Sequence, residues 1–363
     1  MMAVDEQAWV DVGKLEAFVY DVFRGIGVPG GDAATCKDVL IEADLKGFDS
    51  HGVNRLKPVY YDRVKAGQQS PVTRVKVVRE SPTTAVVDGC NGMGMVVASK
   101  AMEMCIEKAG RLGMGMVAVR NSTHYGIAGH YAEMAAKRGM IGVTGTNARP
   151  SVAPTFSVEN MLGTNPLTFA FPTDEDFPYC LDCATSIIQR GKVEVYAREG
   201  RKLPEGLVIG PGGKYMTDPG RILSDMLRGE AALLPLGGAG EETGGYKGYG
   251  YSTVVEILSA SLQSGSYLKT LTGVNLGHFF IAVDVSAFTE LEEFKRTTGD
   301  ILRSLRAAKR APGVDRIYTA GEKEYYTSLD RRSRGIPVTR GVQRELLQMR
   351  DELGLTAHSL PFG

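Results

Sequence analysis

Three polar residues between positions 50 and 55 have the types needed to bind a small organic acid and move a proton on it. Ser50 precedes His51, and Arg55 follows four residues after that histidine. If Ser50 caps a helix, His51 and Arg55 share one helix face beside N–H groups that favour an anion. Arginine can grip a carboxylate, and a neighbouring histidine can protonate an adjacent oxygen. The triplet suits a 2-hydroxy or 2-oxo acid, although an N-capped surface helix is the commoner explanation of this spacing.

A second histidine lies in the segment N121-S-T-H-Y-G126, between a predicted strand and a predicted helix. Such loops, rich in hydroxyl groups and glycine, offer backbone N–H groups to a phosphate, but a plain turn with a helix cap has the same composition. His124 and His130 are too far apart to form the i, i+4 pair of a helical metal site. No His, Cys or carboxylate cluster has ligand spacing, so we expect no metal.

Two further polar stretches could contact a ligand. L162-G-T-N-P-L167 offers Thr164 between apolar runs, and the alternative is a turn set by proline. G244-G-Y-K-G-Y-G250 offers Lys247 among glycines, which suits a phosphate, and the alternative is a flexible hinge.

Several common motifs are absent. The chain has no complete G-x-G-x-x-G, no P-loop and no G-x-S-x-G elbow, so any dinucleotide must bind through a different fold. The pair Cys180 and Cys183 lies in an extended apolar run, where residues three apart face opposite sides of a strand. We therefore interpret these as buried structural cysteines and not as a zinc or redox pair.

Composition describes an ordinary globular protein of 363 residues, 43% hydrophobic and 23% charged, with a net charge of zero. No basic excess indicates nucleic acid, and no segment resembles a signal peptide or a membrane span. We expect a cytoplasmic protein that binds neither nucleic acid nor membranes.

Hydrophobic periodicity divides the chain into two kinds of structure. Residues 1–75 are predicted to be mostly helical, including a helix from Ser50 through Tyr60 to Gly67 with Pro58 inside it. Residues 76–310 alternate strands and helices, which indicates an α/β domain. Residues 311–363 return to helix at 340–354 and are expected to complete a discontinuous helical domain with the N-terminus. Strands are predicted at 72–78, 83–89, 114–120, 140–146, 167–172, 178–184 and 278–285, and helices at 95–113, 127–139, 191–200, 252–265 and 291–310.

Taken together, these stretches resemble the malate/L-lactate dehydrogenase family of the non-Rossmann type. The likeness rests on DLKGFDSHGVNR, RNSTHYGIAGHYAEMA, MLGTNPLTFAFP, LDCATS followed by RGK, GYKGYG and A320-G-E322. ADLKGF, RESPTTAVVDG and NSTHYGIAG are most similar to the malate and L-sulfolactate branch. The resemblance implies an α/β fold with a non-Rossmann dinucleotide-binding domain, a mixed sheet and a mostly helical second domain. It also implies NAD or NADP as cofactor, a homodimer, and (S)-malate, L-sulfolactate or L-lactate as substrate.

The resemblance also implies roles for individual residues. Ser50 and His51 match a pair whose histidine donates or accepts the proton, and His124 matches a second histidine that some members use as the base. Arg55 matches the substrate carboxylate binder, and Thr164 matches a substrate contact. Cofactor contacts are implied for His124, Tyr125, Gly126, Asp182, Cys183, Ala184, Arg190, Gly191, Lys247, Gly321 and Glu322.

The chain departs from the family pattern at three places. Lys192 stands where imine-reducing members have an acid, which favours a 2-hydroxy acid and makes Lys192 a candidate for a second substrate anion. Cys183 replaces a methionine. Residues 239–246 are inserted between Gly238 and Lys247, which leaves the roles of both open. The alternatives are a reductase of ureidoglycolate, 2,3-diketogulonate or a cyclic imine acid, or an inactive dinucleotide-binding protein.

Overall fold

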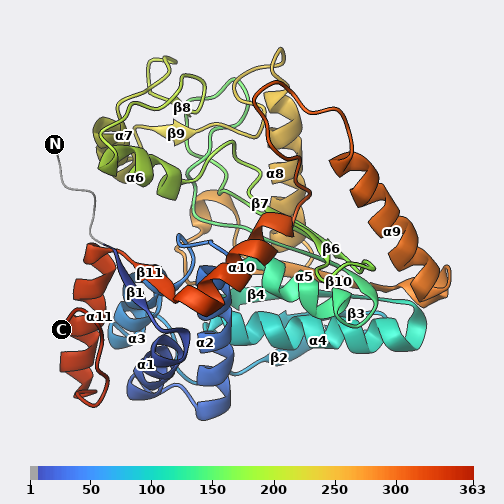
Figure 1. Ribbon diagram of the computed structural model, residues 1–363, viewed down its shortest axis with the longest axis horizontal. Coiled ribbons are helices and arrows are strands. Elements are labelled where there is room, and N and C mark those ends of the chain that lie inside the picture. The colour runs from blue at the N-terminus through green and yellow to red at the C-terminus, as the bar shows by residue number, and fades with distance from the viewer. Residues whose placement is uncertain (1–6) are drawn as a thin grey trace.

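The computed structural model describes residues 7–363, and Figure 1 shows its helices and strands. The strands are β1 (Ala8–Val10), β2 (Lys76–Glu80), β3 (Thr84–Asp88), β4 (Met114–Ser122), β5 (Met140–Thr146), β6 (Leu167–Phe171), β7 (Tyr179–Cys183), β8 (Val208–Ile209), β9 (Ala232–Leu233), β10 (Leu276–Asp284) and β11 (Ile336–Val338). The α-helices are α1 (Val12–Gly25), α2 (Gly30–Leu45), α3 (Asp62–Lys65), α4 (Gly94–Leu112), α5 (Ala128–Ala136), α6 (Arg190–Arg198), α7 (Pro219–Arg228), α8 (Gly245–Ala260), α9 (Leu291–Arg306), α10 (Glu322–Arg334) and α11 (Arg340–Leu353). Shorter helical turns are η1 (Val53–Arg55), η2 (Leu56–Tyr61), η3 (Leu268–Thr270) and η4 (Val285–Ala287).

A mixed sheet of seven strands is the centre of the larger part of the molecule, in the order β2-β3-β4-β10-β5-β6-β7. β3 and β4 run parallel, and the other neighbouring strands are antiparallel. β10 comes from late in the chain and lies between β4 and β5, so that Phe280 pairs with Val117 on one side and Thr144 on the other. The predicted α/β fold with a mixed sheet is therefore confirmed.

Helices cover both faces of this sheet. Alternate residues of β10 point to opposite faces. Phe280 and Ala282 pack in one buried cluster with α4 and α5. Gly277 faces the other way, where a Cβ would overlap the carbonyl oxygen of Ser259 in α8. α8 therefore packs on the face opposite α4 and α5, and it can approach closely because position 277 has no side chain.

The two ends of the chain form a helical part with one shared core. Phe18 and Val22 of α1 belong to the same buried cluster as Leu346 and Met349 of α11. β1 pairs with β11, and Figure 1 shows α1, α2, α3 and α11 grouped beside the sheet. This confirms the helical second domain built from both termini, while its boundaries at 75/76 and 310/311 remain predictions.

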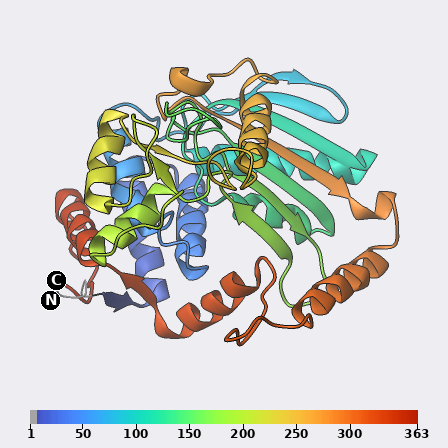
Figure 2. The ribbon, with the colours of Figure 1, turned by 90° about the horizontal axis from the view of Figure 1, so that it is seen from above.

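A smaller lobe consists of α6, α7, β8 and β9 and has its own buried cluster, which includes Val193 and Ile222. Figure 1 shows this lobe above the terminal helices, and in Figure 2, seen from above, it overlies them. α6 was predicted and α7 was not, although its start has ordinary signals. The Asp218 carboxylate accepts the Arg221 N–H, and Pro219 occupies the first turn.

The helix predicted from Ser50 to Gly67 is wrong in its first part. η1 is a 3-10 turn capped at Gly52, η2 is a π-helix, and only α3 is an α-helix. Ser50 makes no N-cap bond to this segment, so His51 and Arg55 do not share a helix face as predicted. Pro58 lies inside η2. Because proline lacks an N–H and clashes with the preceding turn, it disfavours a regular α-helix here.

Three other predictions need correction. The helix predicted at 252–265 begins earlier, because α8 runs from Gly245 to Ala260. α9 ends at Arg306 and not at Arg310. α10 was not predicted, because its Arg- and Glu-rich sequence has few apolar positions. Within residues 7–363, no helix is both long enough and apolar enough to cross a membrane.

Candidate active site

The two histidines singled out in the sequence lie next to each other. His51 is in the turn after α2, and His124 is in the loop between β4 and α5. Their ring centroids are 5.7 Å apart and their planes are inclined by 21°. Burial, together with the positive charge of Arg55, lowers the pKa of His51 to about 4, and the same two effects hold the pKa of His124 well below its usual range. Both imidazoles are therefore neutral at pH 7 in the ligand-free protein.

Each histidine has a hydroxyl partner at Nδ1. The Ser50 hydroxyl lies 2.8 Å from Nδ1 of His51, and the Tyr60 hydroxyl lies 2.7 Å from Nδ1 of His124. The backbone N–H of Gly126 also donates to Nδ1 of His124, at 3.3 Å. In both rings Nε2 is left to face a substrate, which is the arrangement a proton-transferring pair needs.

A buried carboxyl group, that of Asp44, contacts the turn that carries His51. Oδ2 of Asp44 accepts the N–H of Val53 at 2.8 Å, and a Cβ at Gly52 would overlap the Asp44 carboxyl group. Burial, with a smaller contribution from the negative charge of Asp49, raises the pKa of Asp44 to about 8. Asp44 and Gly52 thus fix the turn at close range.

Two arginines, Arg55 and Arg63, lie near the histidine pair, and a third, Arg149, lies near Arg63. Nε of Arg55 donates to the carbonyl of Ser50 at 2.6 Å, and Nη1 of Arg63 donates to the carbonyl of Gly273 at 2.8 Å. Arg149 lies against the same glycine, since a Cβ there would be 3.3 Å from its Nε. Burial and the charge of Arg149 lower the pKa of Arg63. Within residues 7–363, none of the three arginines forms an ion pair with a carboxylate, so their charges remain available to an anion.

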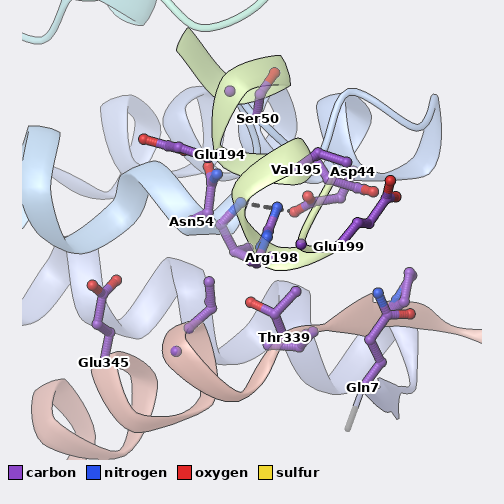
Figure 3. Close-up of a pocket in the computed structure, with 18 residues that line it drawn as sticks. Gln7, Asp44, Ser50, Asn54, Glu194, Val195, Arg198, Glu199, Thr339 and Glu345 are labelled. Atoms are coloured by element: carbon purple, nitrogen blue, oxygen red, sulfur yellow. Dashed lines mark hydrogen bonds between the residues drawn. The ribbon is translucent and has the colours of Figure 1, made fainter. Parts of the chain in front are cut away.

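α6 brings a second group of predicted residues to the turn of Ser50. A Cβ at Gly191 would lie 3.3 Å from that of Ser50. The cavity between α6 and α11 has a volume of about 920 Å³, and Figure 3 shows Ser50 and Asn54 on one side of it and Glu194 on α6. Arg190 pairs with Glu194 at 3.0 Å, and the exposed Lys192 lies over the ring of Tyr196. The structure thus brings Gly191 to the histidine turn but gives Lys192 no contact with it.

Asp182, one of the three residues predicted at the end of β7, lines a second cavity. Asp182 accepts the N–H of Gly129 at 2.7 Å, in the first turn of α5, and burial raises its pKa. The cavity has a volume of about 170 Å³ and is also lined by Lys46 and Gly321. A Cβ at Gly321 would lie 2.9 Å from the carbonyl of Pro178, so only glycine allows this turn to approach β7. Asp182 and Gly321 therefore come together as the resemblance implied.

Five other predicted residues have contacts and burial of their own. The Glu322 carboxylate is fully buried and is held by the Thr319 N–H, Arg306 and Arg316, which together outweigh burial and lower its pKa. The Tyr125 ring stacks on His278 at 4.5 Å inside the core. Cys183 and Ala184 are half-buried at the end of β7, and Thr164 contacts Thr185 through its carbonyl. Of this group, the Thr164 hydroxyl has no hydrogen-bond partner within residues 7–363, whereas the Cys183 thiol donates to the carbonyl oxygen of Leu167 at 4.0 Å.

The inserted residues 239–246 form a loop whose base is closed by glycines. A Cβ at Gly245 would overlap the carbonyl of Gly238, and a Cβ at Gly237 would lie 2.7 Å from Gly244. Gly238 and Gly244 both have positive φ, at 85° and 81°. The loop therefore extends outward without separating Gly238 from the start of α8, where Lys247 lies in the first turn with its Nζ over the Tyr246 ring.

The predicted burial is confirmed for Cys180 and only partly for Cys183. Cys180 is buried and Cys183 half-buried, both are free, and burial raises the pKa of both thiols. In the described part of the chain, no three His, Cys, Asp or Glu side chains form a metal-binding group.

Tyr60, Arg63, Arg149, Asp44 and Lys46 were not predicted as site residues. Tyr60 was interpreted as an apolar position of a regular helix. The one sequence signal against a regular helix here was Pro58, two residues before it. Arg63 and Arg149 come together at Gly273 from separate segments, so no local pattern marks them.

Comparison with known proteins agrees with this geometry. A family model described as malate/L-lactate dehydrogenase matches residues 10–347. The malate dehydrogenase of Pyrococcus abyssi is 44% identical over 94% of each chain, and the L-sulfolactate dehydrogenase of Methanocaldococcus jannaschii is 39% identical over 93% of this chain and 95% of the other. The crystal structure of malate dehydrogenase from Entamoeba histolytica superposes with a TM-score of 0.95 at 45% identity, covering 98% of this chain and 100% of that one.

The fold and the relatives thus define a known class of enzymes, the 2-hydroxy acid dehydrogenases of the malate/L-lactate type. The chain belongs to the malate/L-lactate dehydrogenase family.

Proposed function

We propose that the protein interconverts a 2-hydroxy acid and a 2-oxo acid that carry a second anionic group, with NAD or NADP as cofactor. Malate with oxaloacetate and L-sulfolactate with sulfopyruvate are the pairs of this kind that the relatives' names suggest. The observation that carries the proposal is that Arg55 and Arg63 beside the histidine pair, and Arg149 beside Arg63, have no carboxylate partner among residues 7–363.

The charge on these arginines favours a dianion over lactate. Arg55 is the candidate for the carboxylate next to the reacting carbon, because it is tied to the carbonyl of Ser50 and so lies beside His51. Arg63 and Arg149 are the candidates for the distal carboxylate or sulfonate. A hydrogen bond to a charged group contributes roughly 1.5–3 kcal/mol. This is enough to make kcat/KM for oxaloacetate about tenfold or more higher than for pyruvate. Lys192 is a weaker candidate, because it is exposed and faces Tyr196.

The neutral state of the histidines supports proton transfer in both directions. In oxidation of the hydroxy acid, a neutral imidazole can accept the hydroxyl proton. In reduction, a bound dianion next to the ring offsets the charge of Arg55 and raises the histidine pKa, so the ring can carry the proton that the alkoxide needs. Ser50 can orient His51 by accepting its Nδ1–H, which leaves Nε2 as the base.

The residues beside β7 fit a dinucleotide cofactor. The first turn of α5 offers N–H groups, and the cavity beside it is lined by Gly129, Asp182 and Gly321. We propose Gly129, Asp182, Ala184 and Gly321 as contacts, with Gly191 and Lys247 from the lobe and α8. When bound, the cofactor supplies or accepts the hydride. The chain's own residues bind the acid, hold its carboxylate and move the proton.

We propose a homodimer in which α8 is part of the interface. Its outer face exposes Tyr251, Val254 and Ile257 at 56%, 46% and 52%, which is unusual for successive positions on one helix face. A second copy of the chain would bury this apolar strip. The cytoplasmic location stays a prediction.

The test is a panel of oxaloacetate, sulfopyruvate, pyruvate and oxalurate, each with NADH and NADPH. We expect kcat/KM for oxaloacetate or sulfopyruvate to exceed that for pyruvate by at least about tenfold. A preference for pyruvate or oxalurate would contradict the dianion assignment. Nicotinamide fluorescence detects binding of NADH or NADPH. Binding without turnover of any acid would indicate the inactive binding protein instead.

A further inference from the structure

Tyr60 connects the π-helix η2 to the second histidine. Its ring is fully buried, packs edge-on against Phe23 and places its hydroxyl 2.7 Å from Nδ1 of His124. The next residue, Tyr61, points elsewhere, and its hydroxyl donates to Glu352 of α11 at 2.6 Å. Two consecutive tyrosines therefore have separate partners, and only Tyr60 reaches the histidine pair.

The backbone of Gly126 determines which way the hydrogen bond at His124 runs. A backbone N–H can only donate, and that of Gly126 points to Nδ1 of His124 at 3.3 Å. Nδ1 is therefore an acceptor and carries no hydrogen. The Tyr60 hydroxyl must then donate to it as well, because burial raises the Tyr60 pKa and keeps the phenol protonated. In the neutral ring the hydrogen is on Nε2.

We infer that Tyr60 is a positioning residue that keeps His124 in the Nε2–H form, so that His124 donates a hydrogen bond to the substrate oxygen and His51 exchanges the proton. This division of labour rests on the proposed 2-hydroxy acid activity. The tautomer itself is a property of the ligand-free protein and can be measured separately.

The surroundings of His124 favour the neutral donor form. The charged and titratable groups that face it are His51, Arg55, Arg63 and His278, and each lowers its pKa. No carboxylate contributes, so an imidazolium is unfavourable before a substrate anion arrives. The ring can polarise a carbonyl oxygen as a neutral donor without first gaining a proton.

The Tyr60 hydroxyl has a second acceptor that fits this role. It lies 3.4 Å from the carbonyl oxygen of His124 itself. If the ring becomes protonated with a dianion bound, Nδ1–H can donate to the phenol oxygen while the phenol hydrogen turns to that carbonyl. Tyr60 therefore keeps one orientation of the ring in both protonation states.

The decisive experiment compares Tyr60→Phe with Tyr61→Phe in the full-length protein, using ¹⁵N-histidine NMR and steady-state kinetics. Tyr61→Phe removes a hydroxyl from the neighbouring position and is the matched control. His124→Gln identifies the His124 resonances. In the wild type and in Tyr61→Phe we expect Nδ1 of His124 to resonate as an unprotonated acceptor nitrogen. In Tyr60→Phe we expect a mixture of the two tautomers.

The kinetic constants should change in the variant in which the tautomer of His124 changes. Tyr60→Phe should lower kcat by about tenfold, change KM for oxaloacetate by less than about threefold, and shift the pH profile of kcat. A single Nε2–H tautomer in Tyr60→Phe, or a tautomer mixture with unchanged kcat and pH profile, would overturn the inference. If the wild type turns over no 2-oxo acid, the proposed function fails, and the NMR result still decides whether Tyr60 sets the tautomer.

Discussion

The rings of His51 and His124 lie nearly parallel with centroids 5.7 Å apart, although one follows α2 and the other follows β4. Their Nδ1 atoms have different partners, the Ser50 hydroxyl in one case and the Tyr60 hydroxyl with the Gly126 N–H in the other. Two chemically identical side chains therefore have different roles available to them, because Nδ1 of His124 accepts from the Gly126 N–H and the Tyr60 hydroxyl, whereas Nδ1 of His51 has only the Ser50 hydroxyl beside it among residues 7–363.

His51→Ala should lower kcat by about a hundredfold or more, the usual effect of losing a general acid or base. The folded state should survive, because the ring lies at the site and not in the hydrophobic core. The measurement is steady-state reduction of oxaloacetate. Near-normal turnover would assign the proton transfer to His124.

Arg63→Ala should reduce kcat/KM for oxaloacetate by about tenfold or more and leave pyruvate much less affected, because only the dianion has a distal charge to lose. Arg55→Ala should weaken binding of both acids. Arg79→Ala on the exposed strand β2 is the control for a change in overall charge. Equal losses for oxaloacetate and pyruvate in Arg63→Ala would rule out the distal role.

Asp44 should make the stability of the protein depend on pH. Its pKa is raised to about 8 from an ordinary value of 3.8, so its contribution is complete below about pH 4 and is lost as the pH rises to about 8. Asp44→Asn keeps an oxygen for the Val53 N–H but does not titrate. The free energy of unfolding, measured in urea from pH 5 to pH 9, should fall for the wild type relative to this variant.

Comparing the wild type with Asp44→Asn cancels the contribution of the histidines to the pH dependence of stability, which has the opposite sign to that of Asp44. The depressed pKa values of His51 and His124 reduce stability as the pH falls below about 6.5, in both proteins alike. A difference between wild type and Asp44→Asn that stays constant across the range would show that Asp44 is ionised in the folded state.

Gly52→Ala should distort the turn that carries His51, because its Cβ would overlap the Asp44 carboxyl group. We expect a loss of about 1–3 kcal/mol in unfolding free energy, as for other overpacked sites, together with reduced kcat. Gly31→Ala in α2 is the control, since no atom lies within 4 Å of its Cβ. It should be neutral or more stable by up to about 1 kcal/mol. Full activity in Gly52→Ala would mean that the turn can relax.

Val254→Glu should dissociate the proposed homodimer, because it places a charge in the centre of the apolar face of α8. The mass in solution, measured by light scattering during gel filtration, should fall to that of one chain. Leu112→Glu, at an equally exposed apolar position at the end of α4, should not change the mass. An unchanged dimer in Val254→Glu would exclude this face as the interface.

The regular elements of the α/β part follow from local sequence. β5 forms at the predicted residues 140–146, and α4 differs from its predicted range by a single residue at each end, because their apolar positions recur with the period of a strand or a helix. The segment after Ser50 did not form the predicted helix. Proline disfavours a regular α-helix, but which other backbone geometry replaces it around Pro58 depends on the surrounding tertiary packing. α10 was missed because its few apolar positions leave no clear hydrophobic period.

By itself, the sequence determined the family resemblance, the mixed α/β fold and the two histidines, because these depend on residue types in fixed local order. Only the tertiary structure decided what surrounds the histidines. Tyr60 reaches His124 through a π-helix, and Arg63 and Arg149 meet at Gly273 from distant segments. Hydrogen-bond direction and the sum of nearby charges depend on three-dimensional distance, which no spacing along the chain specifies.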